Sequence, residues 1–255
     1  MPLLGLGTWE ARGEEAKLAV KYAIEKGYRL IDTASFYGNE HEVGAGIKES
    51  KTKRKEIFLT TKLWNSEHDN VKAALGASLS RLGLDYVDLY LIHWPVSKKR
   101  ISTWKEFERL DSKKVRGIGV SNFTKRHLTE LLKHAKIVPC VNQVEFHPYL
   151  YQKELLEFCT KNEIQLEAYS PLGRGAILRD RKIREIGENH SKTPAQIVLR
   201  WHLQHGVIPI PKTVRKERLE ENASIFDFEL SEAQMRSIDS LERSRHFVSD
   251  PEKYA

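Results

Sequence analysis

The sequence predicts an α/β protein of the (β/α)8 TIM-barrel class. Eight short apolar segments alternate with amphipathic stretches of about three turns, the pattern of repeated strand and helix units in a parallel sheet. The alternation runs through 255 residues without a Pro-, Gly- or Ser-rich linker, and this length is ordinary for a barrel. We therefore expect a single domain over residues 1–255. An open doubly wound sheet is the alternative architecture.

The predicted strands are short and rich in aliphatic residues, and they cover residues 3–8, 29–34, 57–63, 87–93, 115–121, 140–146, 165–171 and 207–212. Helices are predicted over residues 14–27, 70–83, 124–135, 152–162, 182–192 and 193–206. Gly27 and Gly83 end two of them, and Thr193 with Pro194 begins the last as N-cap and first helical residue. No G-x-G-x-x-G segment is present, so we expect a fold without a Rossmann motif.

The composition favours a soluble protein that acts on small molecules. The formal net charge is +7, but the basic clusters at residues 51–56 and 97–100 contain no aromatic residues and are interpreted as solvated loops. We therefore expect no nucleic-acid partner. The apolar runs are too short to span a membrane. Two cysteines and an N-terminus without a signal-peptide pattern indicate the cytoplasm.

Polar residues end most of the predicted strands. In a barrel the carboxyl ends of the strands meet at one face, where catalytic residues collect. Asp32 ends the second strand, Lys62 the third and His93 the fourth, while Tyr37 follows the second strand on the same rim. Taken singly, each residue has an ordinary structural explanation. Together they indicate a site, because an apolar strand that ends in a charge needs a partner on the neighbouring strand.

This combination predicts acid catalysis on a carbonyl oxygen. Asp32 would keep Lys62 protonated, and the ammonium group would lower the pKa of Tyr37 so that the phenol acts as general acid. His93 would hydrogen-bond and orient the carbonyl oxygen. Ser121 lacks a G-x-S-x-G frame, and both cysteines fall in predicted core positions, so no nucleophile with its own base is evident. A hydride donor fits the reaction best.

Eight segments resemble, in order and spacing, the signature segments of the aldo-keto reductase family. They are GLGTW (5–9), IDTASFYGNE (31–40), TTKLW (60–64), LIHWP (91–95), GVSNF (119–123), VNQVEFHP (141–148), AYSPLGRG (168–175) and IPKTVRKERLEEN (210–222). The resemblance covers nearly the whole chain. It implies a (β/α)8 barrel that binds NADPH without a Rossmann motif. It also implies a catalytic tetrad of Asp32, Tyr37, Lys62 and His93, in agreement with the strand ends.

The resemblance further implies where the nicotinamide lies. Ser121, Asn122 and Gln143 match the positions that hydrogen-bond its carboxamide, which suits side chains with both donors and acceptors. Tyr169 matches the aromatic residue that stacks on the ring.

The basic segment 212–218 matches the site for the adenosine 2′-phosphate. Lys212, Thr213 and Arg218 correspond to a clamp on this dianion, which implies a preference for NADPH over NADH. The other positions that match the cofactor site are Gly7, Thr8, Trp9, Asp32, Ser170, Leu172, Gly173, Val214, Glu221 and Asn222.

A substrate cup is expected beside the tetrad, formed by Trp9, Phe36, Trp64, His93 and Trp94. Many relatives carry an N-terminal hairpin, whereas this chain begins almost at its first predicted strand, and its loops are short. Short loops predict an open site with a broad preference. The sequence thus resembles the compact prokaryotic branch that includes 2,5-diketo-D-gluconic acid reductase and small-aldehyde reductases.

We therefore expect a cytoplasmic, monomeric, NADPH-dependent oxidoreductase that reduces aldehydes, α-dicarbonyls or keto-sugars, with no bound metal. One alternative is a non-catalytic NADP-binding regulatory or partner subunit, since a fold does not determine a function. Another is a metal-dependent barrel hydrolase that uses Asp32 and His93, although the strand ends carry no set of residues with metal-ligand spacing.

Overall fold

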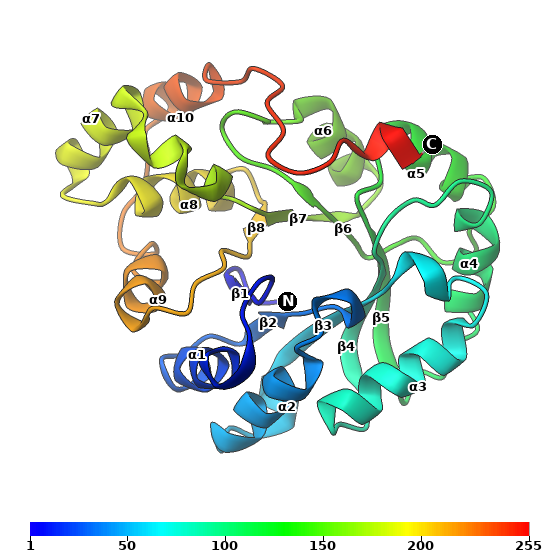
Figure 1. Ribbon diagram of the computed structural model, residues 1–255. Helices are drawn as coiled ribbons and strands as arrows, with labels where there is room; N and C mark the ends of the chain where they lie inside the picture. Colours follow the sequence, from blue (N-terminus) through cyan, green and yellow to red (C-terminus); the bar gives the residue numbers. More distant parts are fainter. Residues whose placement is uncertain (255) are drawn as a thin grey trace.

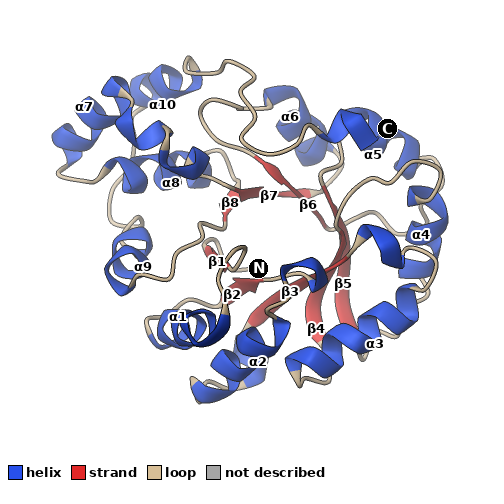
Figure 2. Ribbon diagram, viewed as in Figure 1, coloured by secondary structure: helices blue, strands red, loops and turns tan. Residues whose placement is uncertain are grey.

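The computed structural model describes residues 1–254 and has the barrel architecture that the sequence predicts. Each strand pairs in parallel with the next along the chain. Figure 2 shows the strands at the centre and the helices around them. The strands are β1 (Gly5–Gly7), β2 (Leu30–Asp32), β3 (Phe58–Leu63), β4 (Val87–Ile92), β5 (Val115–Ser121), β6 (Val141–Glu145), β7 (Gln165–Tyr169) and β8 (Ile208–Pro209). The (β/α)8 prediction is confirmed, and the single-domain organisation stays a prediction.

A glycine brings the last strand against the first. Gly7 forms a parallel bridge with Lys212, and its N–H donates to the carbonyl oxygen of Pro211 over 3.2 Å. A Cβ at this position would lie 2.8 Å from the carbonyl oxygen of Ile210. Because any side chain would push the backbones apart, barrel closure requires glycine here.

The helices form the outer layer of the barrel (Figure 1). They are α1 (Gly13–Glu25), α2 (Glu40–Glu49), α3 (Val71–Leu82), α4 (Arg100–Phe107), α5 (Lys125–Leu132), α6 (Lys153–Lys161), α7 (Arg181–His190), α8 (Pro194–Gln204), α9 (Lys216–Ala223) and α10 (Glu232–Asp239). The six predicted helices are confirmed, with Thr193 accepting a hydrogen bond from Gln196 as N-cap of α8. Within residues 1–254, no helix has both the length and the apolar character needed to cross a membrane.

The barrel interior changes from apolar to polar along the strands. Leu30, Ile208 and Ile210 form one buried apolar cluster, and Leu89, Leu91 and Val141 form another. Side chains two residues apart on a strand share a face. Asp32 and Gln143 therefore lie on the same inner face as Leu30 and Val141, one step nearer the carboxyl ends. Their polar layer rests on an apolar floor.

A substitution at Gly44 tests the close packing of α2 against α3 in the outer layer. A Cβ on Gly44 would lie 1.9 Å from the carbonyl oxygen of Leu82 at the end of α3. We expect Gly44→Ala to lower the free energy of unfolding by about 2–3 kcal/mol in urea denaturation, because the two helices must separate.

Gly76→Ala in α3 is the matched control for that substitution. No atom lies within 4 Å of the added Cβ, so we expect stabilisation by about 0.5–1 kcal/mol, the usual gain of alanine over glycine in a helix. Equal stability of the wild type and Gly44→Ala would contradict the close helix contact.

Candidate active site

A cavity of about 840 Å³ lies at the carboxyl ends of the strands. Its size is typical of a small-molecule or cofactor site. Most of the residues expected in a site line it, and these are Gly7, Trp9, Asp32, Phe36, Tyr37, Trp64, His93, Trp94, Ser121, Asn122, Gln143, Tyr169, Ser170, Leu172, Lys212, Thr213, Arg218, Glu221 and Asn222. Residues from distant parts of the chain therefore share one enclosure.

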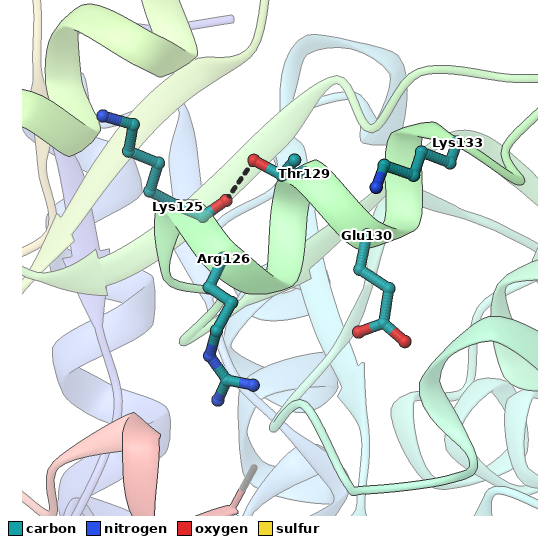
Figure 3. Close-up of a pocket in the computed structure, with 5 residues that line it drawn as sticks. All are labelled: Lys125, Arg126, Thr129, Glu130 and Lys133. Carbon is teal, nitrogen blue, oxygen red and sulfur yellow. Dashed lines mark hydrogen bonds between the residues drawn. The ribbon is translucent and has the colours of Figure 1, made fainter.

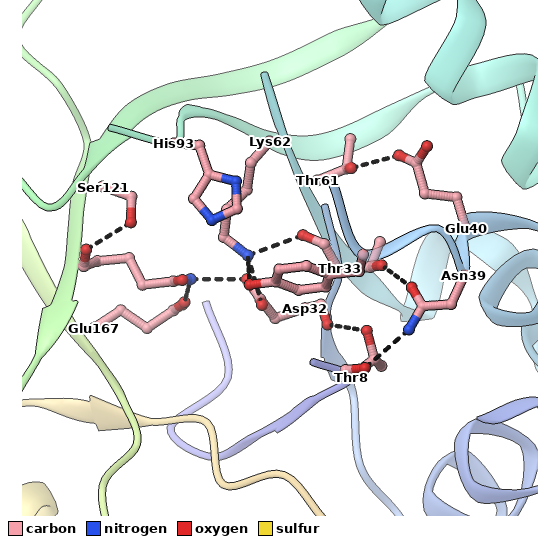
Figure 4. A network of polar contacts seen from close by, with 12 residues as sticks. Thr8, Asp32, Thr33, Asn39, Glu40, Thr61, Lys62, His93, Ser121 and Glu167 are labelled. Atoms are coloured by element: carbon pink, nitrogen blue, oxygen red, sulfur yellow. Dashed lines mark hydrogen bonds and ion pairs between the residues drawn. The ribbon is translucent and has the colours of Figure 1, made fainter. Parts of the chain in front are cut away.

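A buried ammonium group lies at the centre of the polar layer. Lys62 is fully buried, and its Nζ donates to Asp32 Oδ1 over 2.6 Å and to the carbonyl oxygen of Thr33 over 2.9 Å (Figure 4). It also donates to the Tyr37 hydroxyl over 3.2 Å. The predicted pairing of Asp32 with Lys62 is confirmed, and the phenol of Tyr37 lies against the same ammonium group.

The surroundings of Lys62 keep it charged. Burial by itself lowers the pKa of Lys62, but the Asp32 carboxylate and the Tyr37 phenol outweigh it, and the pKa is raised. Burial raises the pKa of Asp32, while the Lys62 ammonium and the Gln143 amide act against that rise. The short contact between the two groups is that of an ion pair.

The expected lowering of the pKa of Tyr37 is wrong. Although the ring borders the cavity, burial raises the pKa of the phenol, and the Lys62 charge opposes this rise only in part. The phenol therefore keeps its proton at neutral pH, as a general acid requires.

His93 presents a neutral imidazole to the cavity. Burial, with a contribution from the Lys62 charge, lowers the pKa of His93 well below its ordinary value. Its Nδ1 has no hydrogen-bond partner among the residues that the structure describes. A neutral imidazole carries one N–H, so it can donate a single hydrogen bond to a ligand oxygen.

The residues expected at the carboxamide form one hydrogen-bonded group. Ser121 Oγ donates to the carbonyl oxygen of Gln143 over 2.8 Å, and Asn122 Nδ2 donates to that of His93 over 2.9 Å. The Tyr169 hydroxyl donates to Asn122 Oδ1 over 2.7 Å. These bonds orient the amide of Asn122 and tie together the ends of β4, β5, β6 and β7.

The residues of the expected phosphate clamp line the same cavity, at and just before the start of α9. Thr213 is buried and accepts a hydrogen bond from the N–H of Arg215 over 3.2 Å. Lys212 and Arg218 are exposed cations on the cavity wall. Glu221 accepts a hydrogen bond from Thr193 over 2.7 Å, so its carboxylate already has one partner.

Four of the expected site residues do not line the cavity. Lys62 lies behind Asp32 and Tyr37, and Thr8 Oγ1 donates to the carbonyl oxygen of Asp32 over 2.9 Å. Gly173 has a φ of 53°, and a Cβ there would lie 2.8 Å from Phe247. Val214 is half-buried beside Thr213. Three of these residues, Lys62, Thr8 and Gly173, lie behind residues that line the cavity.

Aromatic rings form the expected cup. Phe36 stacks on Trp64 with ring centroids 3.6 Å apart, and on Trp9 at 5.6 Å. The imidazole of His93 meets the Trp64 ring edge-on at 5.1 Å. Phe36 is 47% exposed and Trp9 38% exposed, so the stack of rings faces the opening of the cavity.

A C-terminal segment lies against the cavity, and no sequence pattern predicted it. The buried carboxylate of Glu145 accepts hydrogen bonds from the N–H groups of Phe247 and Val248, over 2.7 and 3.2 Å, and Val248 lines the cavity. Burial raises the pKa of Glu145, but His147 at 3.1 Å and the two amides outweigh it, so the pKa is lowered. The segment beyond Val248 continues to α5 (Figure 1), where Glu252 pairs with Arg126 at 2.6 Å.

Other wall residues were also missed, and these are Glu10, Pro171, Arg174, Gly175, Leu178, Ala195, Ile210 and Pro211. Glu10 and Arg174 have positive φ values of 62° and 51°, a backbone state that side-chain patterns do not reveal. Glu167 does not line the cavity but hydrogen-bonds Gln143 from inside β7, and it was missed because it lies neither at a strand end nor in a segment that carries the resemblance.

A second depression lies outside the barrel, along α5 (Figure 3). Several of its polar groups already have protein partners: Thr129 donates to the carbonyl oxygen of Lys125, and Glu130 pairs with Arg100. We regard it as an ordinary helix surface. In the described residues 1–254, no group of three His, Cys, Asp or Glu is placed to hold a metal ion.

Comparison with known proteins decides the family, since residues 3–243 match the model of the Aldo/keto reductase family. The chain belongs to the aldo/keto reductase family. This family member is 51% identical over 257 residues to the glyoxal reductase of Bacillus subtilis (strain 168), spanning 99% of this chain and 93% of that protein. It is 51% identical over 261 residues to the 9,11-endoperoxide prostaglandin H2 reductase of Trypanosoma cruzi (strain CL Brener), spanning 100% and 92%.

Solved structures agree with the family assignment. The crystal structure of MGS-M4, an aldo-keto reductase enzyme from a Medee basin deep-sea metagenome library, matches with a TM-score of 0.95 at 46% identity. The match covers 98% of this chain and 94% of that chain. The resemblance found in the sequence is thus confirmed for this aldo/keto reductase, as is its fold.

The buried ion pair leads to a stability prediction. Lys62→Met leaves Asp32 buried without its cation, and we expect a loss of about 3–5 kcal/mol in free energy of unfolding at neutral pH. Adding Asp32→Asn removes the uncompensated charge and should recover part of this loss. Both values come from urea denaturation.

Lys21→Met provides the control, because Lys21 pairs with Glu25 on the surface at 2.8 Å. We expect a loss of at most about 1 kcal/mol for this exposed pair. A double variant less stable than Lys62→Met alone would contradict the role of the buried charge.

Proposed function

We propose that the protein is an NADPH-dependent reductase of aldehydes, α-dicarbonyls or keto-sugars, with Tyr37 as general acid. The observation that carries the proposal is the contact of one buried ammonium group with both Asp32 and Tyr37, beside a neutral His93. This arrangement sets a protonated phenol and an N–H donor at the same end of the cavity. Both groups can address one carbonyl oxygen.

The cavity suits a nicotinamide cofactor with a 2′-phosphate. Its wall carries the amide and hydroxyl groups of Ser121, Asn122 and Gln143 together with the cations Lys212 and Arg218. Amide partners fit a carboxamide, and a guanidinium with an ammonium fits a phosphate dianion. When bound, NADPH supplies the hydride. Tyr169 would stack on the ring, and Ser170 and Leu172 would lie along the pyrophosphate, with Gly173 behind them.

Side chains of the protein would supply the proton that the carbonyl oxygen receives. Tyr37 donates its proton to the carbonyl oxygen as negative charge develops there, and Lys62 stabilises the phenolate that remains. Asp32 keeps Lys62 in position and charged. The N–H of His93 orients the carbonyl oxygen, and the rings of Trp9, Phe36, Trp64 and Trp94 exclude water from the reacting atoms.

The aromatic cup and the relatives support small carbonyl substrates. The Bacillus subtilis relative is named as a reductase of glyoxal, which is the simplest α-dicarbonyl. The aromatic rings of the cup offer such a molecule a flat apolar surface beside His93. We therefore place α-dicarbonyls and simple aldehydes first among the substrates. We also propose that the protein works as a cytoplasmic monomer, with a small-molecule carbonyl compound as its partner.

Tyr37→Phe tests the proposed acid. We expect kcat for NADPH oxidation to fall by at least about 100-fold with methylglyoxal and 4-nitrobenzaldehyde, because the phenol is the only proton donor proposed. A diketo-sugar acid completes the substrate panel. Tyr86→Phe, which removes a hydroxyl from a ring stacked between Arg54 and Arg116, is the control and should retain its rate.

Full activity of Tyr37→Phe would refute its role as acid. NADPH binding by the wild type without turnover of any substrate in the panel would instead favour the non-catalytic subunit.

Arg218→Ala tests the preference for NADPH. We expect the KM for NADPH to rise about 10-fold or more while the KM for NADH changes little, because only NADPH carries the phosphate. Lys216→Ala, which removes a cation of the same helix that stacks on Tyr22, should leave both KM values unchanged. Equal effects of Arg218→Ala on the two cofactors would count against the clamp.

A further inference from the structure

Glu167 is a buried carboxyl group for which the mechanism above has no use. It lies in β7, paired in register with Gln143 of β6, and it has no exposed surface. Tyr169 is two residues further along the same strand and lines the cavity, so both side chains belong to the inner face of the barrel. Glu167 is therefore one layer below the proposed nicotinamide site.

Glu167 helps to determine which hydrogen-bonding atoms of the Gln143 side-chain amide are free to contact a ligand. Gln143 Nε2 donates one hydrogen bond to Asp32 Oδ2 over 2.7 Å and a second to Glu167 Oε1. An amide nitrogen has two hydrogens, so both are used. Gln143 Oε1 accepts no hydrogen bond from any residue in the described part of the chain, and Gln143 lines the cavity. The amide thus presents an acceptor to a ligand and no donor.

The charge balance of the layer favours a neutral Glu167. Asp32 and Lys62 already form one ion pair, so an ionised Glu167 would leave an uncompensated negative charge in the interior. Its Oε2 is buried and has no hydrogen-bond partner among residues 1–254. An unpartnered oxygen is far costlier as part of an anion than as part of a neutral carboxyl group.

The charged groups around Glu167 act in the same direction. Burial first, and then the negative charge of Asp32, raise the pKa of Glu167 to about 8, against smaller contributions from Lys62 and Gln143. Tyr37 and Cys140 are the other titratable groups that the Glu167 charge affects, and it raises the pKa of both. An ionised Glu167 would therefore make Tyr37 a weaker acid.

We propose that Glu167 is a positioning residue that retains its proton in the folded protein and, with Asp32, holds the Gln143 amide so that its oxygen accepts from the cofactor carboxamide. The part that concerns the carboxamide rests on the proposed function, whereas the retained proton does not. The expected ligand group is an N–H donor, and the carboxamide NH2 of nicotinamide is one. The neutral carboxyl also leaves Lys62 and Asp32 as a balanced pair behind Tyr37.

The retained proton is tested without any cofactor. An unfolded glutamate ionises at about pH 4.3, so between about pH 5 and 8 the wild type gives up the Glu167 proton only on unfolding. Stability then falls as the pH rises. Glu167→Gln has no such proton, so its Tm minus that of the wild type should increase steadily from pH 5 to about pH 8 and then level off.

Glu145→Gln is the matched control, since Glu145 is also a buried carboxylate but its pKa is lowered. Glu145 is ionised in both states above about pH 5, and its contacts His147 and His246 are of a residue type that ordinarily titrates at about pH 6.5, so its difference in Tm from the wild type should stay constant between about pH 7 and pH 8. A constant difference for Glu167→Gln as well would overturn the retained proton. If Glu167→Gln does not fold, infrared spectroscopy of the wild type provides the test. The retained proton predicts the band of a protonated carboxyl group that persists to about pH 7 and disappears at high pH. The absence of this band would refute the proposal.

Cofactor binding tests the orientation of Gln143. Glu167→Gln still offers an acceptor to Gln143 Nε2, and we expect its Kd for NADPH, from protein fluorescence, to stay within about threefold of the wild type. Glu167→Leu removes that acceptor and should weaken binding about 10-fold. Its kcat at saturating NADPH should change less than its Kd. Equal Kd values for the two variants would overturn the positioning role.

The two proposals fail in different ways. A wild type that binds NADPH but reduces no carbonyl compound would refute the proposed reductase and leave the Glu167 results standing. A pH-independent Tm difference with normal NADPH oxidation would refute only the retained proton.

Discussion

A buried ammonium group needs an anion and several acceptors, and this requirement organises the interior of the barrel. Lys62 meets it with Asp32, the carbonyl oxygen of Thr33 and the phenol of Tyr37, all within 3.2 Å. Asp32 in turn is held by Thr8 through its carbonyl oxygen and by Gln143 through its carboxylate. Removal of either charge, Lys62 or Asp32, alters the charge balance of the whole layer, because the low polarity of the surroundings screens little.

The barrel makes this layer possible by bringing neighbouring strands into register. Asp32 and Lys62 are 30 residues apart in the chain but lie on paired strands. Because the barrel already holds these strands together, the contact between the two side chains costs little further conformational entropy. The apolar clusters beneath exclude water, and the close approach at Gly7 brings Lys212, which lines the cavity, against the first strand. The fold and the proposed chemistry therefore share the same contacts.

The strand ends allowed much of the site to be predicted, because position at the end of a strand is visible in the sequence. Asp32, Lys62, Tyr37 and His93 were found this way. The pKa of Tyr37 was misjudged because it depends on enclosure by residues far apart in the chain. Glu167 escaped notice because it lies inside a strand, where alternation shows a face but not what that face contacts. The attachment at Glu145 joins residues about 100 positions apart, and no local pattern records it.

The way the C-terminal segment is attached has a consequence for how such an enzyme diversifies. Glu145 holds the segment through the backbone N–H groups of Phe247 and Val248, which almost any residue can supply. Val248, which lines the cavity, takes part through its backbone, whereas Phe247 also packs its ring on His147. Substitutions at Val248 can therefore remodel the cavity wall while the segment stays in place, so a new substrate preference can arise without loss of this attachment.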